Sequence, residues 1–216
     1  MTLLPDFSQI AFDEQFVNFE AFEQQFDENR QFFTEGVNLF NKADLFYSRR
    51  IGGNPKNYTN ANLDDLSNTT QSFTRMLNAT KITGTTDNNL SMGVLNAITA
   101  SNFISGTDSS GNPVEVLTEP LTNYNVFAFD QRLNGNSSIG FINTNVLRSN
   151  EEGAARDANV TAVTTNLNFL NNSHFLNAAL GRSSVYDIED AHNGTALGWE
   201  LGKQTGAWRW THEMDL

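Results

Sequence analysis

From residue 76 onward the chain repeats one pattern, in which two segments of alternating side chains are separated by a short turn. The last copy, residues 195–213, shows it most clearly. One set of alternate positions in this copy holds Leu197, Trp199, Leu201, Trp208 and Trp210. The positions between them hold Gly198, Glu200, Gly202, Arg209 and Glu213. Period-two alternation around a bend at Gly206 predicts an antiparallel β-hairpin with the two sets on opposite faces.

Three earlier hairpins follow the same pattern. We expect residues 78–86 to pair with 90–100, residues 123–133 with 137–147, and residues 161–170 with 174–183. Each turn is short and rich in asparagine, a residue that tolerates turn conformations. The predicted fold is therefore mainly β, an antiparallel up-and-down meander of about eight strands over residues 76–216. Residues 1–75 would form a separate N-terminal extended and helical segment.

The lengths of strands and connections indicate where such a meander belongs. A strand of about ten residues fits a tilted membrane-crossing strand. The expected connections between hairpins, residues 102–122, 148–158 and 185–194, are longer than the turns within them. This asymmetry is typical of outer-membrane β-barrels and favours a barrel over a soluble sandwich. We therefore expect outer-membrane lipid as a partner, with Trp199, Trp208 and Trp210 at the membrane interface.

The N-terminal part differs in pattern. Residues 1–18 look extended, whereas Phe19, Phe22 and Phe26 follow the spacing of a short amphipathic helix. Residues 28–52 interleave charges with aromatic side chains, a mixture that fits no one-faced element. We expect this stretch to pack in or under the barrel, with its arginines paired and its phenylalanines buried. Residues 53–74 are polar and rich in turn formers, which predicts a loop.

Composition excludes several classes of function. The formal net charge is −12, which argues against a nucleic-acid partner. Cysteine is absent, so disulfides and thiolate zinc sites are excluded, and the three histidines lack metal-ligand spacing. We therefore expect no metal and no cofactor. The N-terminus lacks the basic and apolar regions of a signal peptide, so an exported chain would be truncated.

One pair of acids is a candidate for catalysis. Glu28 and Glu35 are seven positions apart, and a carboxylate pair could serve a glycoside hydrolase. The favoured interpretation is that they neutralise the charge cluster formed by Arg30, Arg49 and Arg50, because buried guanidinium groups need acceptors. We predict that Arg49 or Arg50 bonds to a carboxylate or to backbone carbonyls.

Several segments resemble a known family. They are residues 5–9 (PDFSQ), 28–36 (ENRQFFTEG), 39–40 (LF), 45–52 (LFYSRRIG), 81–85 (KITGT) and 90–97 (LSMGVLNA). They resemble uncharacterised outer-membrane proteins of Bacteroidota whose N-terminal half is a family-nine-type carbohydrate-binding sandwich and whose C-terminal half is a β-barrel. The resemblance covers about the first hundred residues; the later hairpins match only in pattern. Gln31 stands where many relatives have proline, and the carbohydrate-binding half is missing.

The resemblance implies a part of an outer-membrane barrel that handles or transports carbohydrate at the cell surface. It also implies further strands, since eight are fewer than this family's barrel should have. We therefore predict an open sheet, in which the strand beginning near Asn78 does not bond to the strand ending near Glu213. Two alternatives remain, a glycan-directed hydrolase of the cell envelope and a soluble β-sandwich adhesin.

Overall fold

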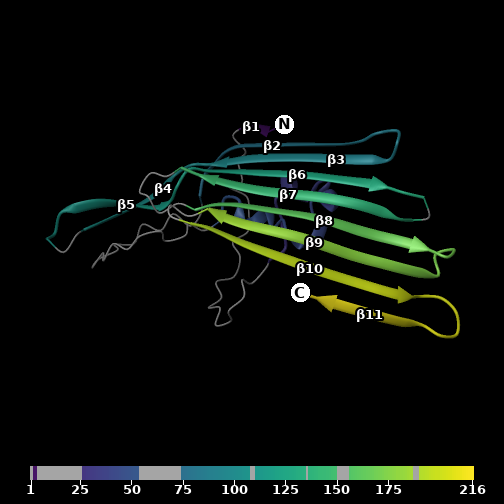
Figure 1. The fold of residues 1–216 in the computed structure, drawn as a ribbon. Coiled ribbons are helices and arrows are strands. Elements are labelled where there is room, and N and C mark those ends of the chain that lie inside the picture. The colour runs from purple at the N-terminus through teal and green to yellow at the C-terminus, as the bar shows by residue number, and fades with distance from the viewer. Residues whose placement is uncertain are drawn as a thin grey trace.

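A computed structural model describes residues 2–3, 26–53, 74–107, 110–134, 136–149, 156–186 and 190–216 (Figure 1). Most of these residues belong to β-strands. The helix expected over residues 19–26 lies outside the described residues except for Phe26, which is not helical. Almost all of the expected extended segment 1–18 and of the expected loop 53–74 also lies outside them.

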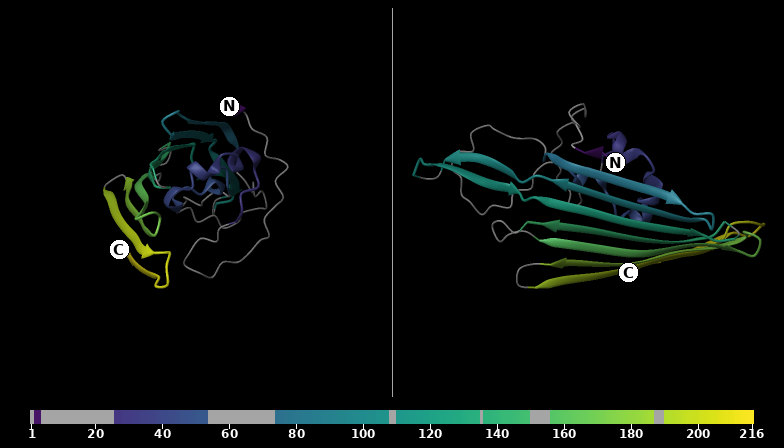
Figure 2. Two further views of the ribbon diagram at one scale, coloured as in Figure 1. Left: turned by 90° about the vertical axis from the view of Figure 1, so that its right-hand side faces the viewer. Right: turned by 90° about the horizontal axis from the view of Figure 1, so that it is seen from above.

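The main sheet is an antiparallel meander, as the alternation predicts. Its eight consecutive long strands are β2 (Met76–Thr85), β3 (Leu90–Thr99), β6 (Thr122–Arg132), β7 (Ser138–Arg148), β8 (Asp157–Phe169), β9 (His174–Tyr186), β10 (Ala191–Lys203) and β11 (Trp210–Asp215). A two-residue strand, β1 (Thr2–Leu3), pairs with the outer edge of β2. The sheet curves strongly, so that it has a concave and a convex face (Figure 2).

Cross-strand register determines which residues share a face, because directly opposed residues in an antiparallel pair point the same way. Gly93 opposes Ala128, which opposes Ile142, which in turn opposes Ala162. The last three are buried on the concave side. Each strand's intervening residues point to the convex side.

The turns within hairpins lie close to their predicted positions. Asn89, Asn136, Asn171 and Asn172 adopt positive φ angles, the left-handed conformation that asparagine tolerates better than most residues. The last hairpin differs from the prediction, because β11 begins at Trp210. The preceding two residues, 208 and 209, therefore belong to a turn that is longer than expected.

The connections between hairpins depart from the prediction in two places. Residues 102–122 contain a second hairpin, formed by β4 (Asn102–Thr107) and β5 (Pro113–Glu119), which projects beyond the main sheet (Figure 1). The expected connection 185–194 is much shorter, because β9 and β10 stay paired as far as Tyr186 and Ala191. Continued backbone pairing at that end replaces the expected loop with strand.

Residues 26–53, here called the inner segment, lie on the concave side of the sheet (Figure 2). They form α1 (Gln31–Thr34) and three 3-10 helices, η1 (Val37–Leu39), η2 (Lys42–Asp44) and η3 (Ser48–Arg50). Glu35 is extended after α1, Gly36 is left-handed before η1, and Ala43 and Asp44 are left-handed within η2, so no long helix forms. η1 packs against β3 and β6, and η2 against β7 and β8. This confirms the expected helical and irregular N-terminal element.

The sheet is open. Among the described residues β11 pairs only with β10, and β2 pairs only with β1 and β3. The strand that contains Asn78 and the strand that contains Glu213 are therefore not bonded, as predicted. The core lies between the inner segment and the concave face of the first five long strands; it includes Phe33, Phe40, Ile51, Leu95, Val126 and Ile142.

Candidate functional site

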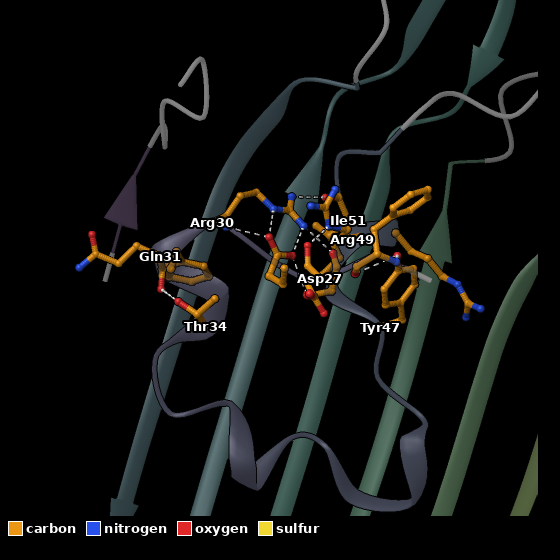
Figure 3. A network of polar contacts seen from close by, with 12 residues as sticks. Asp27, Arg30, Gln31, Thr34, Tyr47, Arg49 and Ile51 are labelled. Carbon is orange, nitrogen blue, oxygen red and sulfur yellow. Dashed lines mark hydrogen bonds and ion pairs between the residues drawn. The ribbon is translucent and has the colours of Figure 1, made fainter. Parts of the chain in front are cut away.

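The charge cluster predicted in residues 28–50 forms around one ion pair (Figure 3). The Arg30 guanidinium donates to both carboxylate oxygens of Glu28, from Nε at 2.8 Å and from Nη2 at 2.7 Å. It also donates to the backbone oxygens of Ser48, at 2.8 Å, and Ile51, at 2.6 Å. Its Cζ lies 4.3 Å from the ring centroid of Phe33. Arg30 is 8% exposed, and this contact set satisfies a guanidinium that burial would otherwise destabilise.

The same contacts favour the ionised form of Glu28. Partial burial alone would raise its pKa, but hydrogen bonds from Arg30 and from the Ser48 hydroxyl outweigh burial and hold the pKa below its usual value. A general acid needs the opposite, a raised pKa. The geometry therefore favours a structural role for Glu28. Catalysis by Glu28 and Glu35 stays a hypothesis.

The other members of the predicted cluster are placed differently. Arg49 donates from Nε to the backbone oxygen of Asp27 at 2.6 Å, so the prediction that Arg49 or Arg50 bonds to a carboxylate or a carbonyl is confirmed (Figure 3). The Arg50 guanidinium lies 5.7 Å from the Tyr47 ring centroid. Glu35 is exposed and accepts a hydrogen bond from Gln31 at 2.8 Å.

Two lysines that sequence reasoning did not single out bind the inner segment to the sheet. Lys42 of η2 forms an ion pair with Asp130 of β6. Lys81 of β2 donates to the backbone oxygens of Phe32 and Glu35, and its ammonium lies 5.0 Å from the Phe32 ring centroid. Inward-pointing charges within strands were the available signal, since such residues require partners on the concave side.

The convex face carries a continuous band of exposed apolar side chains, here called the outer apolar belt. Every long strand contributes to it. Its members are Ile82, Met92, Val94, Phe127, Phe129, Ile139, Val163, Phe169, Leu180, Leu197, Trp210 and Met214. Their exposed fractions run from 36% to 66%. Isolated exposed apolar residues are ordinary, whereas here exposed apolar side chains occur on one face of all eight long strands.

Asparagines border the belt on the side away from the short turns. These asparagine rows comprise Asn96, Asn123, Asn125, Asn143, Asn145, Asn159 and Asn193. Their side chains bond to one another across strands: Asn96 donates to Asn123 at 2.6 Å and to Asn125 at 2.8 Å. Asn143 donates to Asn159 at 3.1 Å. The convex face therefore changes from mainly apolar to mainly polar along the strands, although the exposed Leu147 lies opposite Asn123.

The three tryptophans predicted at the membrane interface lie at the last hairpin. Trp199 opposes Met214, and Trp210 opposes Lys203, so both rings lie on the convex face. Glu200 opposes Glu213 on the other face, as the alternation predicts, and this face is the concave one. Trp208 precedes β11 in the turn and is 83% exposed. The interface role of the tryptophans stays a prediction.

Among the described residues, no group of three or more acidic or histidine side chains is arranged to hold a metal ion. Within the same part of the chain, no helix is both long and apolar enough to cross a membrane.

Comparison with known proteins gives one result. The sequence profile of a family described as a domain of unknown function, DUF5916, matches residues 1–216. No curated protein and no solved structure matches the chain. Because the profile covers every residue of the sequence, the chain belongs to the DUF5916 family.

Proposed function

We propose that the meander is a section of the wall of an outer-membrane β-barrel of the Bacteroidota family that the sequence resembles. In this proposal the outer apolar belt faces lipid and the inner segment fills the lumen side. The protein would serve the handling or transport of carbohydrate at the cell surface. One observation carries the membrane proposal: the sheet has exposed apolar side chains on its convex face and its packed, partly charged contacts on its concave face.

An apolar face opposite the core is not what water favours. A soluble sheet covered on one face buries its large apolar side chains on that face and exposes polar ones on the other. Here Phe127 and Phe129 point away from the core while their neighbour Ala128 is fully buried. Burying apolar surface is favourable by about 25 cal/mol per Å², so exposing such a belt to water is costly and placing it in lipid is not.

The border of the belt supports the same orientation. The asparagine rows carry amide groups that would be expensive in hydrocarbon, so they belong in the headgroup region or beyond it. They lie towards the β4–β5 hairpin, whereas the short turns lie at the opposite end of the strands (Figure 1). Short turns at one membrane surface and longer excursions at the other are typical of outer-membrane barrels.

The carbohydrate part of the proposal is supported by the family resemblance alone. The geometry of the described residues argues against each of the two alternatives, the sandwich adhesin and the glycan hydrolase. A sandwich adhesin needs a second sheet packed face to face on the first, and the described residues form one curved sheet and a projecting hairpin. A hydrolase acting through Glu28 would have to disrupt its ion pair with Arg30.

The absence of cysteine allows a direct test of the membrane proposal. Single cysteines at Val163 and Thr164 are adjacent on β8 but point to opposite faces. Each is labelled with an environment-sensitive fluorophore, and the full chain is reconstituted into phosphatidylcholine vesicles with and without brominated acyl chains. We expect bromine to quench the label at position 163 strongly and the label at position 164 weakly.

A third variant, Asn125→Cys, reports on the border of the belt. It shares the convex face with Val163 but lies in the asparagine rows, so its label should be quenched less. Equal quenching at positions 163 and 164, or failure of the chain to associate with vesicles, contradicts the membrane proposal. The carbohydrate part is tested separately, by uptake of labelled oligosaccharide in cells with and without the protein. Equal uptake contradicts that part.

A further inference from the structure

A cavity of about 450 Å³ lies between the end of the inner segment and strands β6, β7 and β8. This volume is within the range of small-molecule sites in proteins. The residues that define its chemistry are Tyr47, Arg50, Tyr124, Val126, Val146 and Arg148. None of them belongs to the Glu28–Arg30 ion pair.

The register explains why these side chains converge. Tyr124 opposes Val146, and Arg148 opposes Thr122, which is buried. Tyr124, Val126, Val146 and Arg148 all occupy the set of alternate positions that faces the concave side. They form an apolar and aromatic wall with a guanidinium at the end of β7. The opposite wall is provided by Arg50 of η3 and by residues 45–47 and 51–53 on either side of this helix.

Arg148 is only partly satisfied by the described residues. Its backbone N–H donates to Asp157 Oδ1 at 2.7 Å, and its Nη1 donates to the backbone oxygen of Arg156. Its Nε is buried and has no hydrogen-bond partner among the described residues. Leaving a buried charged donor unpaired is costly. Arg148 lines the cavity, so an acceptor that reached its guanidinium from there would gain a strong hydrogen bond.

The charges of the lining favour an anion. Two of its charged side chains are arginines, Arg50 and Arg148, and one is an acid, Glu119. The Arg50 guanidinium lies 5.7 Å from the Tyr47 ring centroid, which keeps the cation beside an aromatic surface. Arginine presents a fork of donors that matches a carboxylate, and aromatic or branched side chains pack against a flat ring.

We propose that this cavity binds a small organic acid with a ring-shaped body. Its carboxylate would lie on Arg148, with the ring against Tyr124 and Val146. Two kinds of compound share this chemistry, sugar acids and aromatic acids. The proposal goes beyond the membrane function and does not depend on it, because the cavity lies between the inner segment and the concave face.

Isothermal titration calorimetry of the purified full chain tests the proposal. The probes are glucuronate with glucose as its neutral counterpart, and phenylacetate with 2-phenylethanol as its neutral counterpart. We expect one acid to bind at least about tenfold more tightly than its counterpart, as a charge-assisted hydrogen bond would require. The acid that binds identifies the kind of ligand. Equal binding of acid and neutral compound, or no binding of either acid at millimolar concentration, overturns the proposal.

Two variants locate the site. Arg148→Gln should weaken acid binding at least about tenfold. The matched control, Arg132→Gln, removes an exposed arginine at the far end of β6 and should leave binding unchanged. Val146→Phe fills the cavity without touching an arginine and should also abolish binding. Unchanged binding in Val146→Phe, checked for folding by circular dichroism, overturns the proposal even if Arg148→Gln fails to fold.

Discussion

Gly93 of β3 lies directly against the ring of Phe40 from the inner segment. A β-carbon at position 93 would stand 2.8 Å from Phe40 Cζ and 2.8 Å from Leu39 Cδ2, closer than such atoms approach in proteins. Phe40 is 1% exposed and has no room to retreat. The absent side chain at position 93 therefore makes the space into which the inner segment packs.

Gly93→Ala should weaken the attachment of the inner segment. We expect overpacking to lower the free energy of unfolding by about 1–3 kcal/mol. Guanidinium titration that starts from the folded protein measures this difference. Gly84→Ala is the control, because a β-carbon there would meet no atom within 4 Å. That substitution should be neutral or slightly stabilising. Equal effects of the two substitutions would contradict the packing argument.

Arg30→Met should be among the most damaging single substitutions in the inner segment. It would leave the Glu28 carboxylate partly buried without its bidentate partner, and removing one member of a buried ion pair costs about 3–5 kcal/mol. The double variant Glu28→Gln/Arg30→Met removes both charges and should recover part of that loss. Thermal unfolding of the two variants measures the difference. A double variant less stable than Arg30→Met would show that the pair is not the cause.

The Glu28 contacts predict a dependence of stability on pH. The folded-state pKa of Glu28 lies below its ordinary value of 4.5, so its ionised form stabilises the fold. This contribution is fully present above pH 4.5 and is lost as the pH falls through the folded-state pKa. The stability difference between the wild type and Glu28→Gln should therefore shrink as the pH is lowered below 4.5. A constant difference between pH 6 and pH 3, about the range in which carboxylates titrate, would contradict it.

The last hairpin carries two like charges in direct opposition. Glu200 of β10 and Glu213 of β11 are cross-strand partners on the concave face, and like charges there destabilise a sheet. Glu213→Lys should raise the free energy of unfolding by about 0.2–1 kcal/mol, and Glu213→Gln by less. The measurement is chemical denaturation at low ionic strength, because salt screens such pairs. A stabilisation that persists in 1 M salt would show that charge is not its source.

Local alternation carried most of the information about the sheet. Period-two patterns and turn-forming residues, which depend only on neighbours in sequence, predict the four hairpins and their order. They also predict that Trp199 and Glu200 lie on opposite faces of the sheet. Pairing also made some elements longer than the pattern indicated. β9 and β10 extend to Tyr186 and Ala191, and β4 with β5 replaces an expected loop, because backbone hydrogen bonds stabilise strands whose side chains do not alternate clearly.

For the inner segment, the sequence predicted burial and paired arginines but not the contacts that its residues make with the sheet. Interleaved charges and aromatics indicated burial and paired arginines, and Arg30 and Arg49 have such acceptors. The partners were not predictable: Lys81 reaches backbone oxygens of residues 32 and 35, and Lys42 reaches Asp130, across separations that no local pattern encodes.

The sequence by itself determined the alternation, and therefore which side chains share a face and which strands are neighbours. It did not determine which face would be concave, because period two gives two equivalent faces. Only the tertiary structure decided that the face holding Gly93, Ala128 and Ala162 lies against the inner segment. The opposite face, which holds Phe127 and Phe129, points outward. The physical reason is space: the bulky side chains of the inner segment fit only against a face that leaves room for them.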